Sequence, residues 1–316
     1  MERRRVALTF DVDLVDWVAK QNVDELNDVM PALLRALGEV GDVRATFFVR
    51  LDDGIARRFG RADHAFVHAA ALWERVREAG HEVAWHHHAV AQAPAAGNAV
   101  ADSAVATNSA IELPECDRDR LSEAVRLHSQ TARDFDCSSA RMGWGQHTNA
   151  TLNQLAKDGW RVDSSAMPRP VYAWDPPLRD WSQTPTMPHL IAHTDTLPVC
   201  EAPRARGLWE VPMTMVPLAT STDTQPDLRR YVNPAYRRDV FATAIAQAPV
   251  TAPLVLLCHP YECVGGRNHP LYAFSMDAVR ANLSLLTDQG ARWMTIAEVV
   301  TEVESRRPVE IDAYAA

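Results

Sequence analysis

Strand-like and helix-like segments alternate along almost the whole chain. Short apolar runs typical of buried strands are followed by segments whose apolar residues recur every three or four positions, the spacing of an amphipathic helix. The strand-like runs are 5–11, 43–49, 82–85, 140–143, 160–163, 208–211 and 254–258, and the helical segments are 24–37, 69–79, 118–135, 149–158, 237–247, 276–289 and 296–305. This alternation predicts an α/β fold with a parallel sheet and right-handed crossovers. About seven such units favour an irregular (β/α) barrel, although the pattern alone leaves an open sheet as the alternative.

The length and the irregular stretches of the chain bound its domain organisation. A chain of 316 residues fits a single barrel domain over 1–316 that carries long loop insertions. Two stretches lack a regular pattern: about 89–116, rich in Ala, Asn and Ser, and about 164–207, rich in Pro. Long irregular segments of a compact domain usually either cover a functional site or are disordered. In a barrel we expect both insertions to lie over the site.

The charge and the cysteine content of the chain limit the classes of binding partner and the cell compartment that we expect for the protein. The net charge is −9, from 32 basic and 41 acidic residues, and no long basic run is present, so we expect no nucleic-acid partner. The N-terminal segment MERRRVALTFDVD lacks the apolar core of a signal peptide, and we find no membrane-spanning stretch. The five cysteines form no CxxC pair, which argues against a disulfide framework or a zinc knuckle. We therefore predict a cytoplasmic protein without membrane contact. The sequence is compatible with a homo-oligomer but does not define the oligomeric state.

Two aspartates end the first strand-like run. Asp11 and Asp13, in LTFDVD, lie two residues apart and so face the same side of an extended chain. Two carboxylates on one side repel each other and favour protonation unless a cation lies beside them. The pattern therefore favours a cation site, and a turn in which an aspartate caps the next segment is the alternative.

Three consecutive histidines follow a later strand-like run. In GHEVAWHHH, His86 and His88 share one side of the chain and can bind one ion, whereas His87 points away. Neutral imidazole is a common ligand for zinc and similar ions. A histidine-rich surface loop is the alternative, but the position directly after a strand favours a metal site.

Two further ionisable residues stand at strand ends. Arg141 begins RMGWG, where its guanidinium can pair with a carboxylate such as Asp11, although an arginine on the surface is the alternative. His259, in LLCHPYE, is placed for acid–base chemistry or is a buried structural histidine. Because the carboxyl ends of parallel strands meet at one face of a barrel, we expect these groups to lie together. Together they would supply a metal, a base, a cation that orients the base, and an acid.

Taken in order, these segments resemble one known family. LTFDVD, ATFFV, GHEVAWHHH, RMGWG, GWRVDSS, LLCHPYE and RWMTIAEVV are similar in order and spacing to the polysaccharide deacetylases, the NodB-homology or carbohydrate esterase superfamily. The resemblance runs from Val6 to Val300, nearly the whole chain. It implies a distorted (β/α) barrel that holds one divalent metal ion. Zinc is preferred, and cobalt, nickel, iron or manganese also suit the ligands.

The resemblance also implies a role for each residue. Asp11 resembles the catalytic base, Asp13 the metal carboxylate, His86 the first metal histidine, Arg141 the arginine that tethers the base, and His259 the general acid. The family's second metal histidine lies four residues after the first, where Val90 stands here. A subset of relatives with DxD and HxH arrangements nominates His88 instead. His87 as the third ligand, or a weaker or absent metal, remains open.

The expected function is metal-dependent hydrolysis that removes an N-acetyl or other acyl group from a small, sugar-like metabolite inside the cell. Trp144, Trp174 and Trp181 are candidates for stacking on a sugar ring, with packing within the long loops as their alternative role. A second interpretation is an amidohydrolase that acts on a non-sugar amide, imide or ureide. A third is a barrel that lost its metal chemistry and serves as a binding protein, motivated by Val90.

Overall fold

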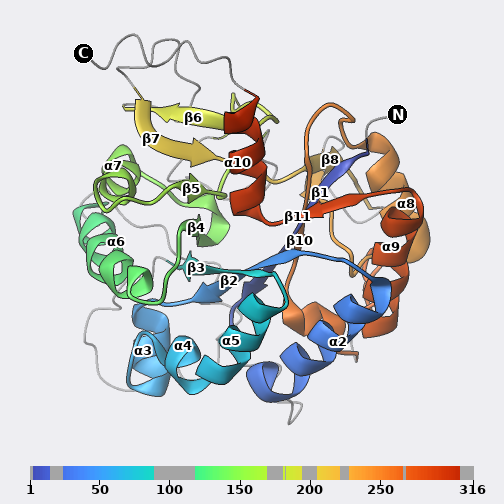
Figure 1. Ribbon diagram of the computed structural model, residues 1–316, viewed down its shortest axis with the longest axis horizontal. Helices are drawn as coiled ribbons and strands as arrows, with labels where there is room; N and C mark the ends of the chain where they lie inside the picture. Colours follow the sequence, from blue (N-terminus) through green and yellow to red (C-terminus); the bar gives the residue numbers. More distant parts are fainter. Residues whose placement is uncertain are drawn as a thin grey trace.

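One curled sheet surrounded by helices organises the protein (Figure 1). The computed structural model describes residues 3–14, 24–88, 118–168, 181, 183–193, 205–220, 228–265 and 268–306. The strands are β1 (Arg5–Val12), β2 (Ala45–Arg50), β3 (Glu82–His87), β4 (Ser139–Met142), β5 (Val162–Asp163), β6 (His189–Ala192), β7 (Ala205–Glu210), β8 (Met215–Pro217), β9 (Arg229–Tyr231), β10 (Leu254–Cys258) and β11 (Arg292–Met294). The α-helices are α2 (Met30–Val40), α3 (Asp53–Phe59), α4 (His64–His68), α5 (Ala70–Glu78), α6 (Arg118–Arg133), α7 (Asn149–Lys157), α8 (Arg238–Gln247), α9 (Met276–Asp288) and α10 (Ile296–Ser305).

The sheet has nine strands in the order β10-β1-β2-β3-β4-β5-β7-β6, with β11 also paired to β1. All pairings are parallel except that of β6 with β7, and β8 and β9 form a separate antiparallel pair. The seven predicted strands are present. The four that were not predicted, β6, β8, β9 and β11, have only three or four residues each, too few for a clear alternation of apolar residues.

The segment after β7 crosses the gap between β7 and β10. Val211 N–H donates to Asp163 O at 2.9 Å on the β5 side. Thr214 N–H donates to Val255 O at 3.2 Å, and Val255 N–H donates to Thr214 Oγ1 at 2.9 Å on the β10 side. These bonds join the segment to β5 on one side and to β10 on the other, and the predicted irregular α/β barrel is confirmed as a curled half-barrel sheet.

The predicted helices are also present, with bounds that differ by a few residues. The first of them begins with a π-helical turn, η1 (Glu25–Val29), before α2. Asp24 Oδ1 caps this turn by accepting from the N–H groups of Leu26 and Asn27. The short helices α3 and α4 were not predicted, because seven and five residues do not establish a helical period.

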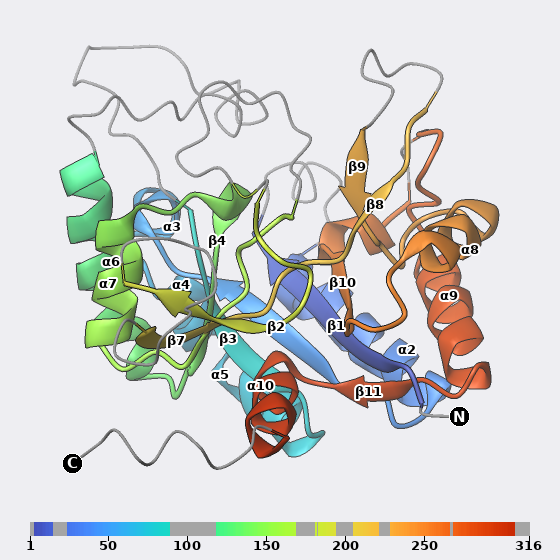
Figure 2. The ribbon, with the colours of Figure 1, turned by 90° about the horizontal axis from the view of Figure 1, so that it is seen from above.

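Alternate side chains of β1 pack into two different hydrophobic cores. Val6, Leu8 and Phe10 belong to the large core between the sheet and the surrounding helices. Ala7 lies on the opposite side, in a smaller core inside the barrel that α10 covers at one end (Figures 1 and 2). Because side chains two apart share a side, the residues that follow Ala7 at odd positions also face the barrel interior. The first strand therefore carries its aspartates inward.

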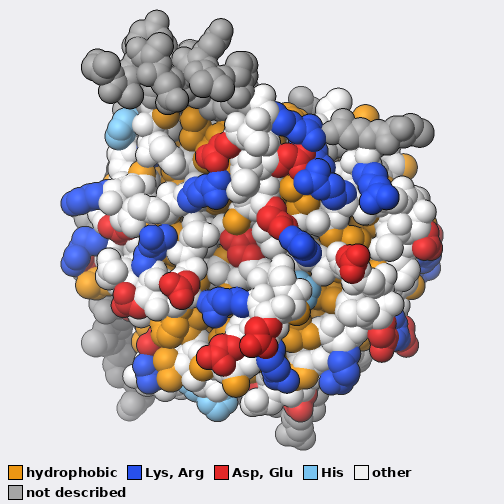
Figure 3. Space-filling model, in the orientation of Figure 1, with side chains coloured by type: hydrophobic (Ala, Val, Ile, Leu, Met, Phe, Trp, Pro, Cys, Tyr) orange, Lys and Arg blue, Asp and Glu red, His pale blue; other side chains and the backbone are white. Residues whose placement is uncertain are grey.

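The surface and the helices show ordinary features of a globular protein. On the face drawn in Figure 3, basic and acidic side chains are interspersed and neither kind forms an extended area. None of the helices in the described ranges combines the length and the apolar composition needed to cross a bilayer.

Replacing Thr214 tests the hydrogen bond that joins the segment after β7 to β10. Replacing Thr214 with Val removes the hydroxyl that accepts from the buried N–H of Val255. An unsatisfied buried donor costs about 1–3 kcal/mol. We expect the free energy of unfolding, measured by urea denaturation, to fall by about that amount, while Thr214→Ser, which keeps the hydroxyl, leaves it nearly unchanged. Equal stability of the Val variant and the wild type would show that this bond does not contribute.

Candidate active site

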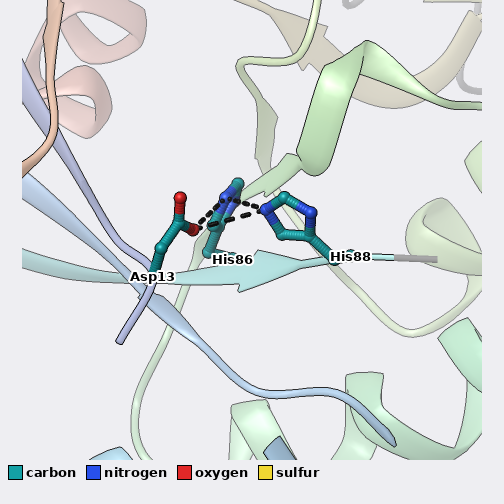
Figure 4. Close-up of side chains that lie close together, drawn as sticks. All are labelled: Asp13, His86 and His88. Carbon is teal, nitrogen blue, oxygen red and sulfur yellow. Dashed lines mark hydrogen bonds and ion pairs between the residues drawn. The ribbon is translucent and has the colours of Figure 1, made fainter. Parts of the chain in front are cut away.

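Three ligand atoms from strand ends converge inside the barrel (Figure 4). Asp13 follows β1, His86 lies in β3 and His88 follows β3, and all three side chains are buried. Asp13 Oδ1 lies 3.2 Å from His86 Nε2 and 3.3 Å from His88 Nε2, and the two Nε2 atoms are 2.9 Å apart. β2 separates β1 from β3 in the sheet, so the site is assembled across an intervening strand.

The hydrogen bonds around this trio suit a divalent cation. His86 Nδ1 lies 2.9 Å from the carbonyl oxygen of Arg141, so Nδ1 carries a proton, and in the neutral ring Nε2 presents a lone pair. Asp13 Oδ1 is buried and accepts no hydrogen bond from the described residues. Electron-rich atoms packed this closely repel unless a positive charge lies between them. Atoms that each lie about 2 Å from one zinc ion are about 3 Å from one another, so the residues fit such an ion.

Burial and neighbouring charges set the protonation of the trio. Burial raises the pKa of Asp13, but the close contacts with His86 and His88 outweigh it and hold that pKa well below its ordinary value. Burial lowers the pKa of His86, but the negative charges of Asp11 and Asp13 outweigh it and raise that pKa. Burial, helped by the positive charge of Arg50, lowers the pKa of His88. Asp13 is therefore ionised and His88 neutral near pH 7, the forms that bind metals.

His87 turns away from the trio. Its Nδ1 lies 3.3 Å from the carbonyl oxygen of Leu51, and its ring lies 5.6 Å from the ring of His128 on α6. Burial lowers its pKa to about 3, so the imidazole stays neutral. The structure thus brings His88, and not His87, to Asp13 and His86.

Asp11 lies beside the trio and is bound by Arg141, as expected from the sequence. Arg141 NH1 donates to Asp11 Oδ1 at 2.8 Å and to Thr9 Oγ1 at 2.8 Å. The other guanidinium nitrogens donate to the carbonyl oxygen and the hydroxyl of Ser164. The guanidinium also lies 4.1 Å from the ring centre of Phe48, and the side chain is almost fully buried. These contacts leave Asp11 Oδ2 facing His86 Nε2 at 3.8 Å.

His259 follows β10, the neighbour of β1 on the side away from β2. Its Nε2 lies 3.8 Å from Asp13 Oδ2, and its Nδ1 lies 3.3 Å from Glu262 Oε2. The same Glu262 oxygen accepts from the His259 N–H at 2.8 Å and from Asn233 Nδ2 at 2.7 Å. Burial lowers the pKa of His259, but the negative charge of Glu262 outweighs it and raises the pKa to about 9. His259 is therefore protonated near pH 7 and can donate a proton.

The three tryptophans occupy different positions. Trp144 is 38% exposed and has a φ of 57°, a strained conformation of the kind that clusters at functional sites. Trp181 is only 1% exposed and donates its Nε1–H to the carbonyl oxygen of Gly145 at 2.8 Å, which is the loop-packing role. Trp174 lies outside the described residues. Stacking on a ligand therefore stays a prediction for Trp144. The ring of Trp181 is buried and so is not accessible to a ligand.

Sequence reasoning missed the partners of two site residues. Glu262 lies three residues after His259, inside the short 3-10 turn η5 (Pro260–Cys263). This spacing could have suggested a local pair. Arg50 ends β2 and Asp52 follows it in the sequence RLD; Asp52 accepts hydrogen bonds from both Arg50 and the backbone of His88. Their residue types gave no signal, because an arginine and an aspartate two apart are common on protein surfaces.

Sequence comparison identifies no relative of this chain. No protein-family model matches it, and no curated protein is significantly similar to it.

Comparison of structures does find similar folds. A Mycobacterium smegmatis protein, assigned but not established as a polysaccharide deacetylase, superposes with a TM-score of 0.54 at 16% identity, over 96% of this chain and 92% of that one. A mutant of a CE4 family pseudoenzyme with restored activity gives a TM-score of 0.46 at 12% identity, over 95% of this chain and 68% of that one. A family 4 carbohydrate esterase from Streptomyces lividans in complex with acetate gives 0.42 at 13% identity, over 93% of each chain.

Only the superposition on the Mycobacterium smegmatis protein is close enough to support an inference. Because the two sequences are only 16% identical, that inference concerns the fold alone. The chain shares the barrel architecture of the Mycobacterium smegmatis protein, as the resemblance of its sequence segments implied. Its placement in the subset with DxD and HxH arrangements stays a prediction.

Gly143 gives a test of the position of His88. A Cβ atom at Gly143 would lie 2.5 Å from His88 Nδ1 and 2.6 Å from its Cγ and Cε1, so the ring must move if Gly143 becomes Ala. We expect zinc affinity, measured by calorimetric titration, to fall about 10–100-fold, as for other changes next to metal ligands. Gly38→Ala, in α2 with no atom within 4 Å, is the matched control and should leave binding unchanged while stabilising the helix. Unchanged zinc affinity in the Gly143 variant would contradict this account of the site.

Proposed function

We propose that the protein is a metal-dependent hydrolase that removes an N-acetyl or other acyl group by cleaving a C–N bond other than a peptide bond. The observation that carries the proposal is the convergence of Asp13, His86 and His88 between an arginine-bound carboxylate and a protonated histidine. The barrel fold shared with the Mycobacterium smegmatis protein supports it as an analogy only.

The metal would be held by Asp13, His86 and His88. A divalent ion bound by three protein ligands supplies Lewis acidity, which lowers the pKa of water and polarises a substrate carbonyl. The choice of metal stays a prediction: zinc is preferred, and cobalt, nickel, iron and manganese also suit two imidazoles and a carboxylate.

Asp11 is the proposed general base. Its Oδ1 is occupied by the guanidinium of Arg141 at 2.8 Å, so Oδ2 is the oxygen that accepts a proton from the attacking water. Arg141 is almost fully buried, and its bonds to Thr9 and Ser164 hold its guanidinium in place against Asp11. Arg141 thus orients the base and does not itself touch the reacting atoms.

His259 is the proposed general acid. The negative charge of Glu262 outweighs the opposing effect of burial and leaves His259 protonated near pH 7, and Nε2 is the atom that faces the trio, 3.8 Å from Asp13 Oδ2. In this position it donates a proton to the leaving nitrogen as the C–N bond breaks. The ring of Tyr261 stacks on the imidazole with centroids 4.8 Å apart, which restricts its orientation.

A small, sugar-like compound is the substrate expected from the sequence, and the exposed ring of Trp144 offers a surface on which a sugar can stack. Hydrolysis of cyclic amides or ureides, but not of N-acetyl sugars, in a matched substrate panel would favour the amidohydrolase alternative.

Two substitutions separate the metal ligand from the base. Asp13→Ala removes a ligand and should abolish both metal binding and hydrolysis. Asp11→Asn keeps the trio intact, so metal content should match the wild type while kcat falls about 10²–10⁴-fold from loss of the base. Elemental analysis and steady-state kinetics on the same preparations measure both. Hydrolytic activity in the Asp13 variant would refute the scheme, and full activity in the Asp11 variant would remove Asp11 from its role.

A further inference from the structure

His88 lies one residue beyond the end of β3, where the hydrogen bonds of the strand no longer hold the backbone. The last pairs of the β3–β4 ladder join His86 to Arg141 and His87 to Met142. A ligand placed there needs another anchor if its ring is to point at Asp13 and His86. Its backbone N–H supplies one, because it donates to Asp52 Oδ2 at 3.1 Å.

Asp52 is fully buried and uses both of its carboxylate oxygens. Oδ1 accepts from Ile55 N–H at 3.0 Å and so caps α3. Oδ2 accepts from His88 N–H and from Arg50 Nε at 2.6 Å. Burial raises the pKa of Asp52, but the positive charge of Arg50 outweighs it and lowers that pKa, so the carboxylate is ionised. The proposed function makes no use of this buried ion pair.

We propose that Asp52, held by Arg50, is a positioning residue for the metal ligand His88. The carboxylate fixes the backbone of His88 from the end of β2, while Gly143 contacts its ring from the end of β4. His88 is thereby held from both neighbouring strands, and its Nε2 is directed at Asp13 Oδ1 and His86 Nε2. This inference rests on the proposed metal-dependent function, because it concerns the affinity of that site.

The substitution Asp52→Asn separates the anchoring of the His88 backbone from the capping of α3. The N–H groups of Ile55 and His88 bond different oxygens of Asp52, and Asn has only one oxygen, so its oxygen can occupy one of these two positions but not both. If the oxygen caps α3, for which Asn is a good residue, the amide NH₂ group faces the His88 N–H and Arg50, which are also donors. Asp52→Asn should therefore keep the helix and release His88.

The exposed pair Arg61–Asp63 provides a matched control. It has the same spacing in the sequence, and Arg61 Nε lies 2.5 Å from Asp63 Oδ1, but it lies on the surface, and within the described part of the chain it forms no hydrogen bond or ion pair with the trio. Asp63→Asn changes an Arg-x-Asp pair in the same way without touching His88. A second variant, Arg50→Met with Asp52→Asn, removes both charges and so excludes an unpaired arginine as the cause of any effect.

The test is titration of metal-free protein with zinc, together with the visible spectrum of the cobalt(II) form and the unfolding temperature of the metal-free protein. For Asp52→Asn we expect folded protein, a loss of zinc affinity of about 10–100-fold and an altered cobalt spectrum, since changes to residues that support ligands have effects of this size. The double variant should bind zinc as weakly as the single one. Asp63→Asn should match the wild type in all three measurements.

Three results would overturn the inference. Wild-type affinity and an unchanged cobalt spectrum in folded Asp52→Asn would show that His88 needs no such anchor, and the proposed function would survive. Wild-type affinity in the double variant would assign the loss to the unpaired charge of Arg50. No zinc or cobalt binding by the wild type itself would refute the proposed function and this inference together.

Discussion

The mutual repulsion of electron-rich atoms inside the barrel is the constraint on which the site depends. Asp13 Oδ1 and two imidazole nitrogens lie within 3.3 Å of one another, and Asp11 lies next to them. Such a group is stable only when positive charge balances it. Arg141 supplies that charge on one side and protonated His259 on the other, and a divalent ion held by the trio would supply the rest.

The alternation of side chains in a parallel sheet brings these groups together. Residues two apart share a side, so Asp11 and Asp13 both face inward from β1, as do His86 and His88 from β3, while His87 packs outward. The carboxyl ends of parallel strands meet at one end of the barrel. Asp13 and His259 are separated by most of the chain, and they meet because the strands that precede them, β1 and β10, are neighbours in the sheet.

This geometry explains what the sequence could predict and what it could not. The strand β10 is a continuous apolar run and the helix α10 has a clear helical period, and their predicted bounds hold, whereas β6 and β11 are too short to show either pattern. The strand-end residues could be grouped because topology alone places them together. The partners Asp52 and Glu262 could not, because their roles depend on side-chain distances across strands and turns. For the same reason, composition could not show that Trp181 is buried.

The central claim is that Asp13, His86 and His88 hold one divalent ion. Elemental analysis of protein purified without a histidine tag, for the wild type, His88→Ala and His87→Ala side by side, tests it most directly. The account predicts about one ion per chain in the wild type and in the His87 variant, and loss of the ion in the His88 variant. Equal metal content in the His88 variant and the wild type, or no metal in the wild type after reloading with zinc and cobalt, would contradict it.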